Sequence, residues 1–80
     1  MRIVMRDGRV FEGTGLQIAQ GMKSIAFGVE GMTMAQYLDW VVGNLERFEG
    51  LRLEVVGADE SERAESLVNG MVKAGVAAWG

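Results

Sequence analysis

Two short apolar runs, residues 3–5 and 10–11, lie on either side of an Asp-Gly pair near the start of the chain. Asp-Gly between strand-forming residues is the strongest short-range signal for a β-hairpin. With Asp-Gly as a two-residue turn, Val4 pairs with Phe11. Because successive side chains of a strand alternate between faces, this register predicts that Phe11 lies on the face opposite Ile3, among the arginines of the hairpin.

Three later segments space their apolar residues at the 3.6-residue period of an amphipathic helix. We expect helices from about residue 15 to 27, from 34 to 49 and from 60 to 74. The first two begin with the capping-box pattern, in which a Thr is followed three positions later by a Gln, and Asp59 is placed to cap the third. Trp40 falls about 120° from the centre of the second apolar stripe, which predicts a position on the flank of that helix.

Each predicted helix contains an interior glycine, and these are Gly21, Gly43 and Gly70. A glycine inside a helix costs about 1 kcal/mol relative to alanine. One explanation is close packing of backbones at a helix crossing or at a subunit interface, and the other is weak selection for stability. The sequence leaves both explanations open.

Residues 51–55 alternate apolar and charged side chains, which predicts a strand with one buried face. Whether residues 76–79 add a final strand stays open. The expected order is strand, strand, helix, helix, strand, helix, with or without a last strand. It predicts an α+β fold, a two-layer sandwich in which a short, mostly antiparallel sheet of three or four strands is packed by three helices. Because no repeat or linker occurs, residues 1–80 are expected to form a single domain.

The composition removes many kinds of catalytic chemistry. The 80 residues include no Cys and no His, so the chain has no disulfide, thiolate ligand, thiol nucleophile or imidazole base. Its 12 glycines form neither of the common phosphate-binding patterns. We therefore expect a protein that is not an enzyme and that has no catalytic residue, cofactor or metal site.

Charge is divided unevenly along the chain. The net charge is -3, with +2 over residues 1–25 and -5 over residues 26–80. The acidic residues of the second part lack the spacing of a calcium loop, and we interpret them as helix caps and solvated groups. No apolar run reaches the roughly 18 residues of a membrane helix. The sequence therefore predicts no membrane association and a cytoplasmic location.

Four aromatic residues lie outside the central apolar stripes, and these are Phe11, Tyr37, Trp40 and Trp79. Aromatic residues are enriched at protein interfaces, and a chain of this size has little core in which to hide two tryptophans. The alternative is that the tryptophans only seal the edge of the sheet and the flank of a helix. The first interpretation predicts an interaction module that self-associates, as a homodimer, or binds a protein partner through these residues.

The basic hairpin suggests a different function. Arg2, Arg6 and Arg9, on the predicted face with Phe11, outline a small stacking platform for single-stranded nucleic acid. A sequence pI of about 4.8 counts against this alternative, since phosphate-binding domains are usually basic. Charges that keep an edge strand from aggregating account for the same arginines.

Overall fold

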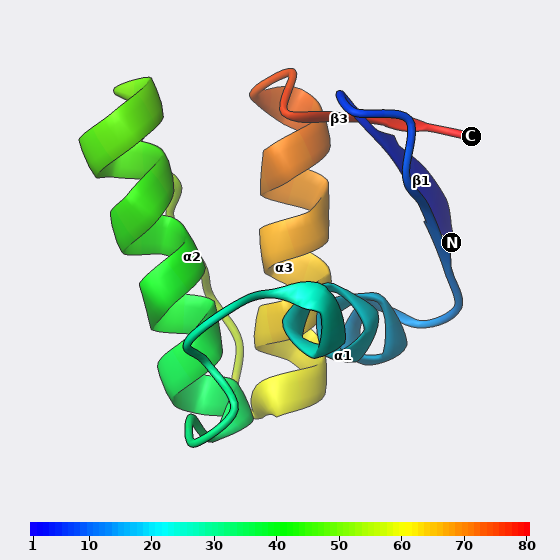
Figure 1. The fold of residues 1–80 in the computed structure, drawn as a ribbon. Coiled ribbons are helices and arrows are strands. Elements are labelled where there is room, and N and C mark those ends of the chain that lie inside the picture. Colours follow the sequence, from blue (N-terminus) through cyan, green and yellow to red (C-terminus); the bar gives the residue numbers. More distant parts are fainter.

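Six elements make up the fold, and the computed structural model describes all 80 residues. In chain order they are β1 (Arg2–Met5), β2 (Val10–Glu12), α1 (Gly15–Ile25), α2 (Met34–Glu49), α3 (Glu60–Lys73) and β3 (Ala77–Trp79). Figure 1 shows all three helices on one side of the sheet. α1 and α3 pack against the strands, and α2 packs against α3 on the side away from the sheet. The predicted α+β class, with a short antiparallel sheet and three helices, is confirmed.

The hairpin is present, but its register differs by one residue from the predicted one. Ile3 pairs with Phe11, and the Met5 N–H donates to the Arg9 carbonyl oxygen at 2.8 Å. The connection therefore has three residues, the last of which, Gly8, has a φ of 89°. A three-residue hairpin loop needs a left-handed residue at its last position, and Gly8 provides it. The Asp-Gly pair is therefore part of a three-residue loop and not a two-residue turn.

The shift of one residue moves Phe11 to the other face of the hairpin. Phe11 shares the helix-covered face with Ile3 and is half-buried against the core. Arg2 lies on the opposite face, because neighbouring residues of a strand point in opposite directions. The prediction that Phe11 and Ile3 lie on different faces of the hairpin, with Phe11 on the face of the arginines, is therefore wrong.

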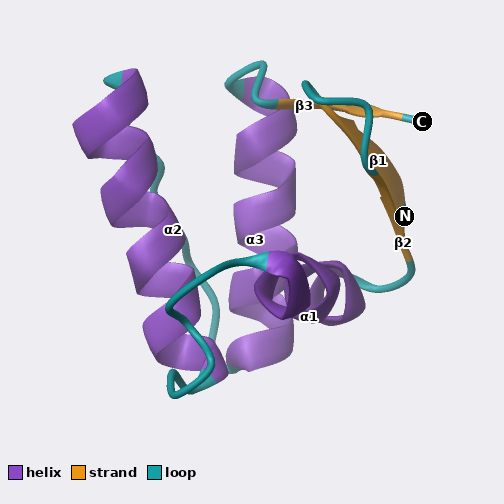
Figure 2. Ribbon diagram, viewed as in Figure 1, coloured by secondary structure: helices purple, strands orange, loops and turns teal.

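Residues 51–55 form no strand, so this prediction is also wrong. Figure 2 shows the connection from α2 to α3 as loop, and in Figure 1 it passes behind α2 and reappears between α2 and α3. Leu51, Leu53 and Val55 are half-buried and pack against the core, while the charged residues between them are exposed. An extended segment can bury alternate side chains against helices as well as within a sheet, so a period of two does not by itself establish strand pairing.

The third strand of the sheet is β3. The strand order is β2-β1-β3, with β3 antiparallel to β1 and Ile3 opposite Trp79. β1 is therefore the central strand, and the Ile3 side chain has no exposed surface. The open question about residues 76–79 is answered by a short strand that covers Ala77–Trp79.

The helices begin and end within two residues of the predicted positions. At the start of α1, the Gln17 N–H donates to Thr14 Oγ1 at 3.1 Å, and the Gln17 side chain accepts from the Thr14 N–H at 2.9 Å. Thr33 and Gln36 form the same reciprocal pair at the start of α2. The Asp59 carboxylate caps α3. Both capping boxes are thus confirmed, and they satisfy N–H groups that have no partner inside the helix.

Two of the three interior glycines have close neighbours. A Cβ on Gly21 would lie 3.0 Å from Phe11 Cδ1. A Cβ on Gly70 would lie 3.6 Å from Leu53 Cδ2. The neighbour at Gly21 would have to give way, and the one at Gly70 would be in ordinary van der Waals contact. A Cβ on Gly43 would meet nothing within 4 Å outside its own helix.

Candidate functional site

An apolar groove runs between α2 and the elements that face it. Its volume is about 310 Å³, and 9 of its 11 lining residues are hydrophobic. We call it the α2 groove, and it lies between Trp40, Leu45 and Phe48 of α2 and Met5, Met22 and Met71 opposite. The three methionines come from β1, α1 and α3, so the groove exists only in the folded chain.

The aromatic part of the α2 groove is a stacked pair. The rings of Tyr37 and Trp40 have centroids 5.8 Å apart and planes inclined by 24°. Tyr37 is 2% exposed and Trp40 is 37% exposed, so the tyrosine supports the tryptophan from inside. Burial raises the pKa of Tyr37 to about 12, because the charged phenolate would lose its hydration. The hydroxyl is therefore neutral at physiological pH, and Trp40 is the member of the pair that a partner can reach.

Phe48 forms the outer end of the α2 wall. It is 75% exposed, and the Arg47 guanidinium lies 5.9 Å from the centre of its ring. Beside it, Arg6 and Glu49 form an ion pair with a nitrogen-to-oxygen distance of 3.3 Å. This end of the groove thus has a charged rim next to an exposed aromatic ring.

Phe11 and Trp79 lie away from the α2 groove. The Phe11 ring packs against α1 at Gly21, under the sheet. Trp79 is on β3, an edge strand, where it is 51% exposed. Of the four aromatic residues proposed from the sequence, the structure brings Tyr37 and Trp40 together and leaves the other two separate.

Three methionines line the groove, and the sequence pattern did not identify them as site residues. Met22 and Met71 belong to the buried stripes of their helices, and Met5 is half-buried at the end of β1. Nothing in their local sequence indicates that the three side chains meet. The one available signal is composition, since 6 methionines in 80 residues is a high content.

The hairpin arginines are not gathered into a platform. Arg6 is engaged by Glu49, and Arg9 pairs with Asp7 at 3.4 Å. Arg2 lies on the outer face of the sheet, away from the aromatic ring of the hairpin. The predicted arrangement of three arginines on one face with an aromatic ring is therefore not formed.

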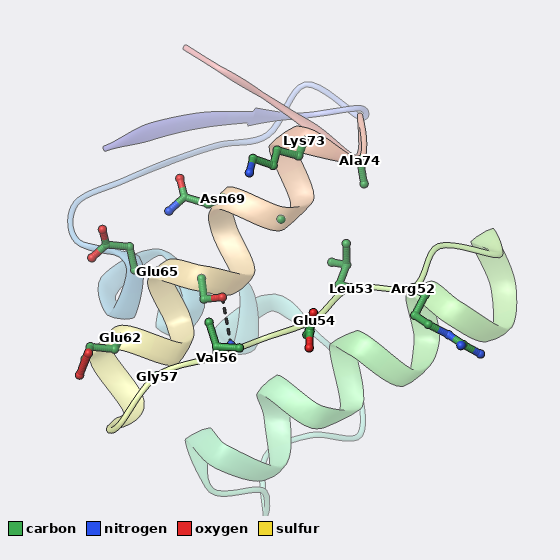
Figure 3. Close-up of a pocket in the computed structure, with 12 residues that line it drawn as sticks. Arg52, Leu53, Glu54, Val56, Gly57, Glu62, Glu65, Asn69, Lys73 and Ala74 are labelled. Atoms are coloured by element: carbon green, nitrogen blue, oxygen red, sulfur yellow. Dashed lines mark hydrogen bonds between the residues drawn. The ribbon is translucent and has the colours of Figure 1, made fainter.

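A larger hollow, of about 750 Å³, lies between residues 52–57 and α3 (Figure 3). Only 3 of its 12 lining residues are hydrophobic, and its charges have both signs, as with Glu62 and Lys73. Inside it the Val56 N–H donates to Ser66 Oγ at 3.1 Å, drawn as the dashed line in Figure 3. No group of three or more carboxylates in the structure is placed to hold a metal ion. The hollow thus has neither an apolar wall nor a concentration of one charge.

None of the three helices combines the length and the apolar character needed to cross a membrane. No protein family, no curated protein and no solved structure matches this chain. Its function is therefore inferred from its own residues.

Proposed function

We propose that the protein is a non-catalytic interaction module, and that its α2 groove receives the apolar side chains of an amphipathic helix from a partner protein. The observation that carries the proposal is the exposure of two aromatic rings beside an open apolar groove. Trp40 is 37% exposed and Phe48 is 75% exposed. Tryptophan is among the residues that contribute most to binding. On the opposite wall, half-buried Met5 is a flexible side chain of the kind that adapts to different apolar partners.

The shape of the α2 groove suits a helix. Trp40, Asn44 and Phe48 follow one another at four-residue spacing along the edge of α2, so they span about 12 Å, or slightly more than two helical turns. A partner helix presents apolar side chains at a matching spacing of i, i+4 and i+7. Its polar face would then meet the ion pair of Arg6 and Glu49, and a charged rim around an apolar centre is typical of protein interfaces.

The energetic gain would come mainly from the two rings. Burying a large apolar side chain completely is worth about 1.5 to 3 kcal/mol. Phe48 retains most of its surface for such burial, and Trp40 retains about a third. Ordering the partner helix opposes this gain, so we expect moderate affinity rather than tight binding.

A small-molecule ligand fits this groove less well. Its volume of about 310 Å³ is at the lower end of the range for ligand pockets. Ligand pockets also direct several polar groups at the ligand, whereas the polar lining here consists of Asn44 and Glu49. The Glu49 carboxylate already pairs with Arg6.

The proposal is tested with a displayed library of amphipathic helical peptides, in which the apolar positions vary among Leu, Ile, Met and Phe. We expect the wild-type protein to select related sequences. Asn44→Trp places an indole in the α2 groove and should weaken the selected peptides by about tenfold or more. Asn69→Trp makes the same substitution on α3 and is the matched control, so it should bind them like the wild type.

Two outcomes would contradict the proposal. One is a library that yields no related sequences against a folded wild-type protein. The other is a set of selected peptides that bind the Asn44→Trp protein as well as the wild type. The cytoplasmic location stays a prediction from the sequence.

A further inference from the structure

The interior glycine of α2 has no explanation within one chain. A Cβ on Gly43 would meet no atom within 4 Å outside its own helix, and the residue is exposed. Phe11 accounts for Gly21, whereas a Cβ on Gly70 would be in ordinary contact with Leu53, on the buried side of its helix. Glycine weakens a helix interior relative to alanine, so the absence of a side chain at this exposed position suggests that another backbone approaches it.

Opposite charges lie at equal distances on either side of Gly43. Asp39 precedes it by four residues and Arg47 follows it by four, which places all three on one row along the outer surface of α2. Arg47 takes part in none of the four ion pairs of the chain. The Asp39 side chain is 73% exposed and accepts one bond from Arg63 at 3.1 Å, which leaves further lone pairs free.

We propose that two copies of this chain form a homodimer through antiparallel α2 helices that cross at Gly43. A two-fold axis at this glycine places the residue four positions before it in one copy beside the residue four positions after it in the other. Asp39 of each copy thus lies beside Arg47 of the second copy. Side chains spaced four residues apart form a ridge along a helix, and the ridges of one helix fit into the grooves of another when the two pack together.

The position of α2 in the fold leaves room for this contact. Figure 1 shows α2 as the outermost helix, with α3 between it and the sheet. Its 16 residues extend for about 24 Å. Trp40 borders the row and is 37% exposed, so a second α2 would cover part of its indole.

Gly43 and the charged residues of the row have different roles in the proposed contact. The missing side chain at Gly43 lets the helix axes approach more closely than the usual 8 to 10 Å. The two symmetric pairs of Asp39 with Arg47 select the antiparallel orientation, because a parallel pairing would bring like charges together. This inference does not depend on a partner helix in the α2 groove.

Sedimentation equilibrium from low to high micromolar concentration tests the proposal. We expect the wild-type protein to reach the dimer mass and Gly43→Leu to remain monomeric. At a low concentration, where both proteins are monomeric, the melting temperature of Gly43→Leu should be equal to that of the wild type or higher. Gly31→Leu is the matched control, since a Cβ there also meets nothing within 4 Å and the residue lies outside α2. It should dimerise like the wild type.

A charge-reversal experiment tests the register without altering Gly43. Asp39→Arg alone and Arg47→Asp alone should each weaken the homodimer by about tenfold or more. When the two variants are mixed, each faces its complement, so a heterodimer should form and be visible by native mass spectrometry. Melting curves establish that each variant is folded.

Three results would overturn the proposal. The first is a wild-type protein that stays monomeric at high micromolar concentration. The second is a dimer that persists unchanged in Gly43→Leu. The third concerns the mixture of the two folded charge variants. The proposal fails if the amount of heterodimer in this mixture does not exceed the amount of homodimer that each variant forms by itself.

Discussion

Gly21 of α1 lies so close to Phe11 of β2 that a Cβ added to the glycine would be 3.0 Å from the ring. This contact joins the first helix to the hairpin. It also gives a reason for a glycine at a position where alanine would favour the helix.

We predict that Gly21→Ala lowers the free energy of unfolding by about 1 to 2 kcal/mol, because the ring must shift within a packed layer. At a concentration where the chain is monomeric, Gly43→Ala, where space is open, should instead raise it by up to about 1 kcal/mol. Urea unfolding of both variants measures the difference. Equal effects of the two substitutions would show that Phe11 does not restrict Gly21.

Gly15→Ala should be more damaging. A Cβ on Gly15 would lie 2.5 Å from the Glu65 Cα atom, so the backbone of α1 or of α3 would have to shift. We predict a loss of about 3 kcal/mol or more, as expected for overpacking against backbone. A thermal melt compares it with Gly31→Ala, which is unhindered. A melting temperature equal to that of the control would be inconsistent with this close approach of α1 and α3.

The capping boxes give a third prediction. Thr33→Ala removes the Oγ1 atom that accepts from the Gln36 N–H at 3.2 Å, and we expect a loss of about 1 kcal/mol. Thr33→Ser retains the hydroxyl and should therefore retain most of the free energy of unfolding that Thr33→Ala loses. If alanine and serine have the same effect in chemical denaturation, the hydroxyl does not act as a cap.

Tyr37 makes stability depend on alkaline pH. Its pKa is raised from 10.0 to about 12 by burial, so the folded state holds the phenolic proton more tightly than the unfolded state does. The resulting contribution to the free energy of unfolding is about 2 to 3 kcal/mol. It is fully present below pH 10 and is lost as the pH rises from about 10 to about 12.

Urea unfolding across this alkaline range measures the effect, with Tyr37→Phe as the control that lacks the ionisable group. Tyr37 is the single tyrosine of the chain, so the ultraviolet absorbance of the phenolate reports its titration directly. A midpoint near pH 10 in the folded protein would contradict the burial of the hydroxyl.

The sequence predicted the features that neighbouring residues determine. Thr14 and Thr33 cap their helices by hydrogen bonds with the glutamines three positions later. Gly50 ends α2 with a left-handed φ of 67°. The apolar stripes likewise gave the correct helices. Each of these choices is made within one or two turns of chain, which is the range that a sequence pattern reports.

The errors arose where one pattern fits two structures. An Asp-Gly pair suits both a two-residue turn and the left-handed end of a three-residue loop, and the difference moved Phe11 to the other face. The alternation at 51–55 suited both a strand and an extended segment on helices. Within the site, Trp40 was identified from its position on the helix, but Met5, Met22 and Met71 meet only through tertiary packing.

The central position of β1 has a consequence for how the molecule assembles. β1 can pair with β2 rapidly, since the connection between them is a short loop. Its other edge waits for β3, which pairs Ile3 with Trp79 across nearly the whole chain. Contacts between such distant positions slow folding. Because β3 comes after the three helices in the chain, one edge of β1 stays unpaired until residues 77–79 reach it.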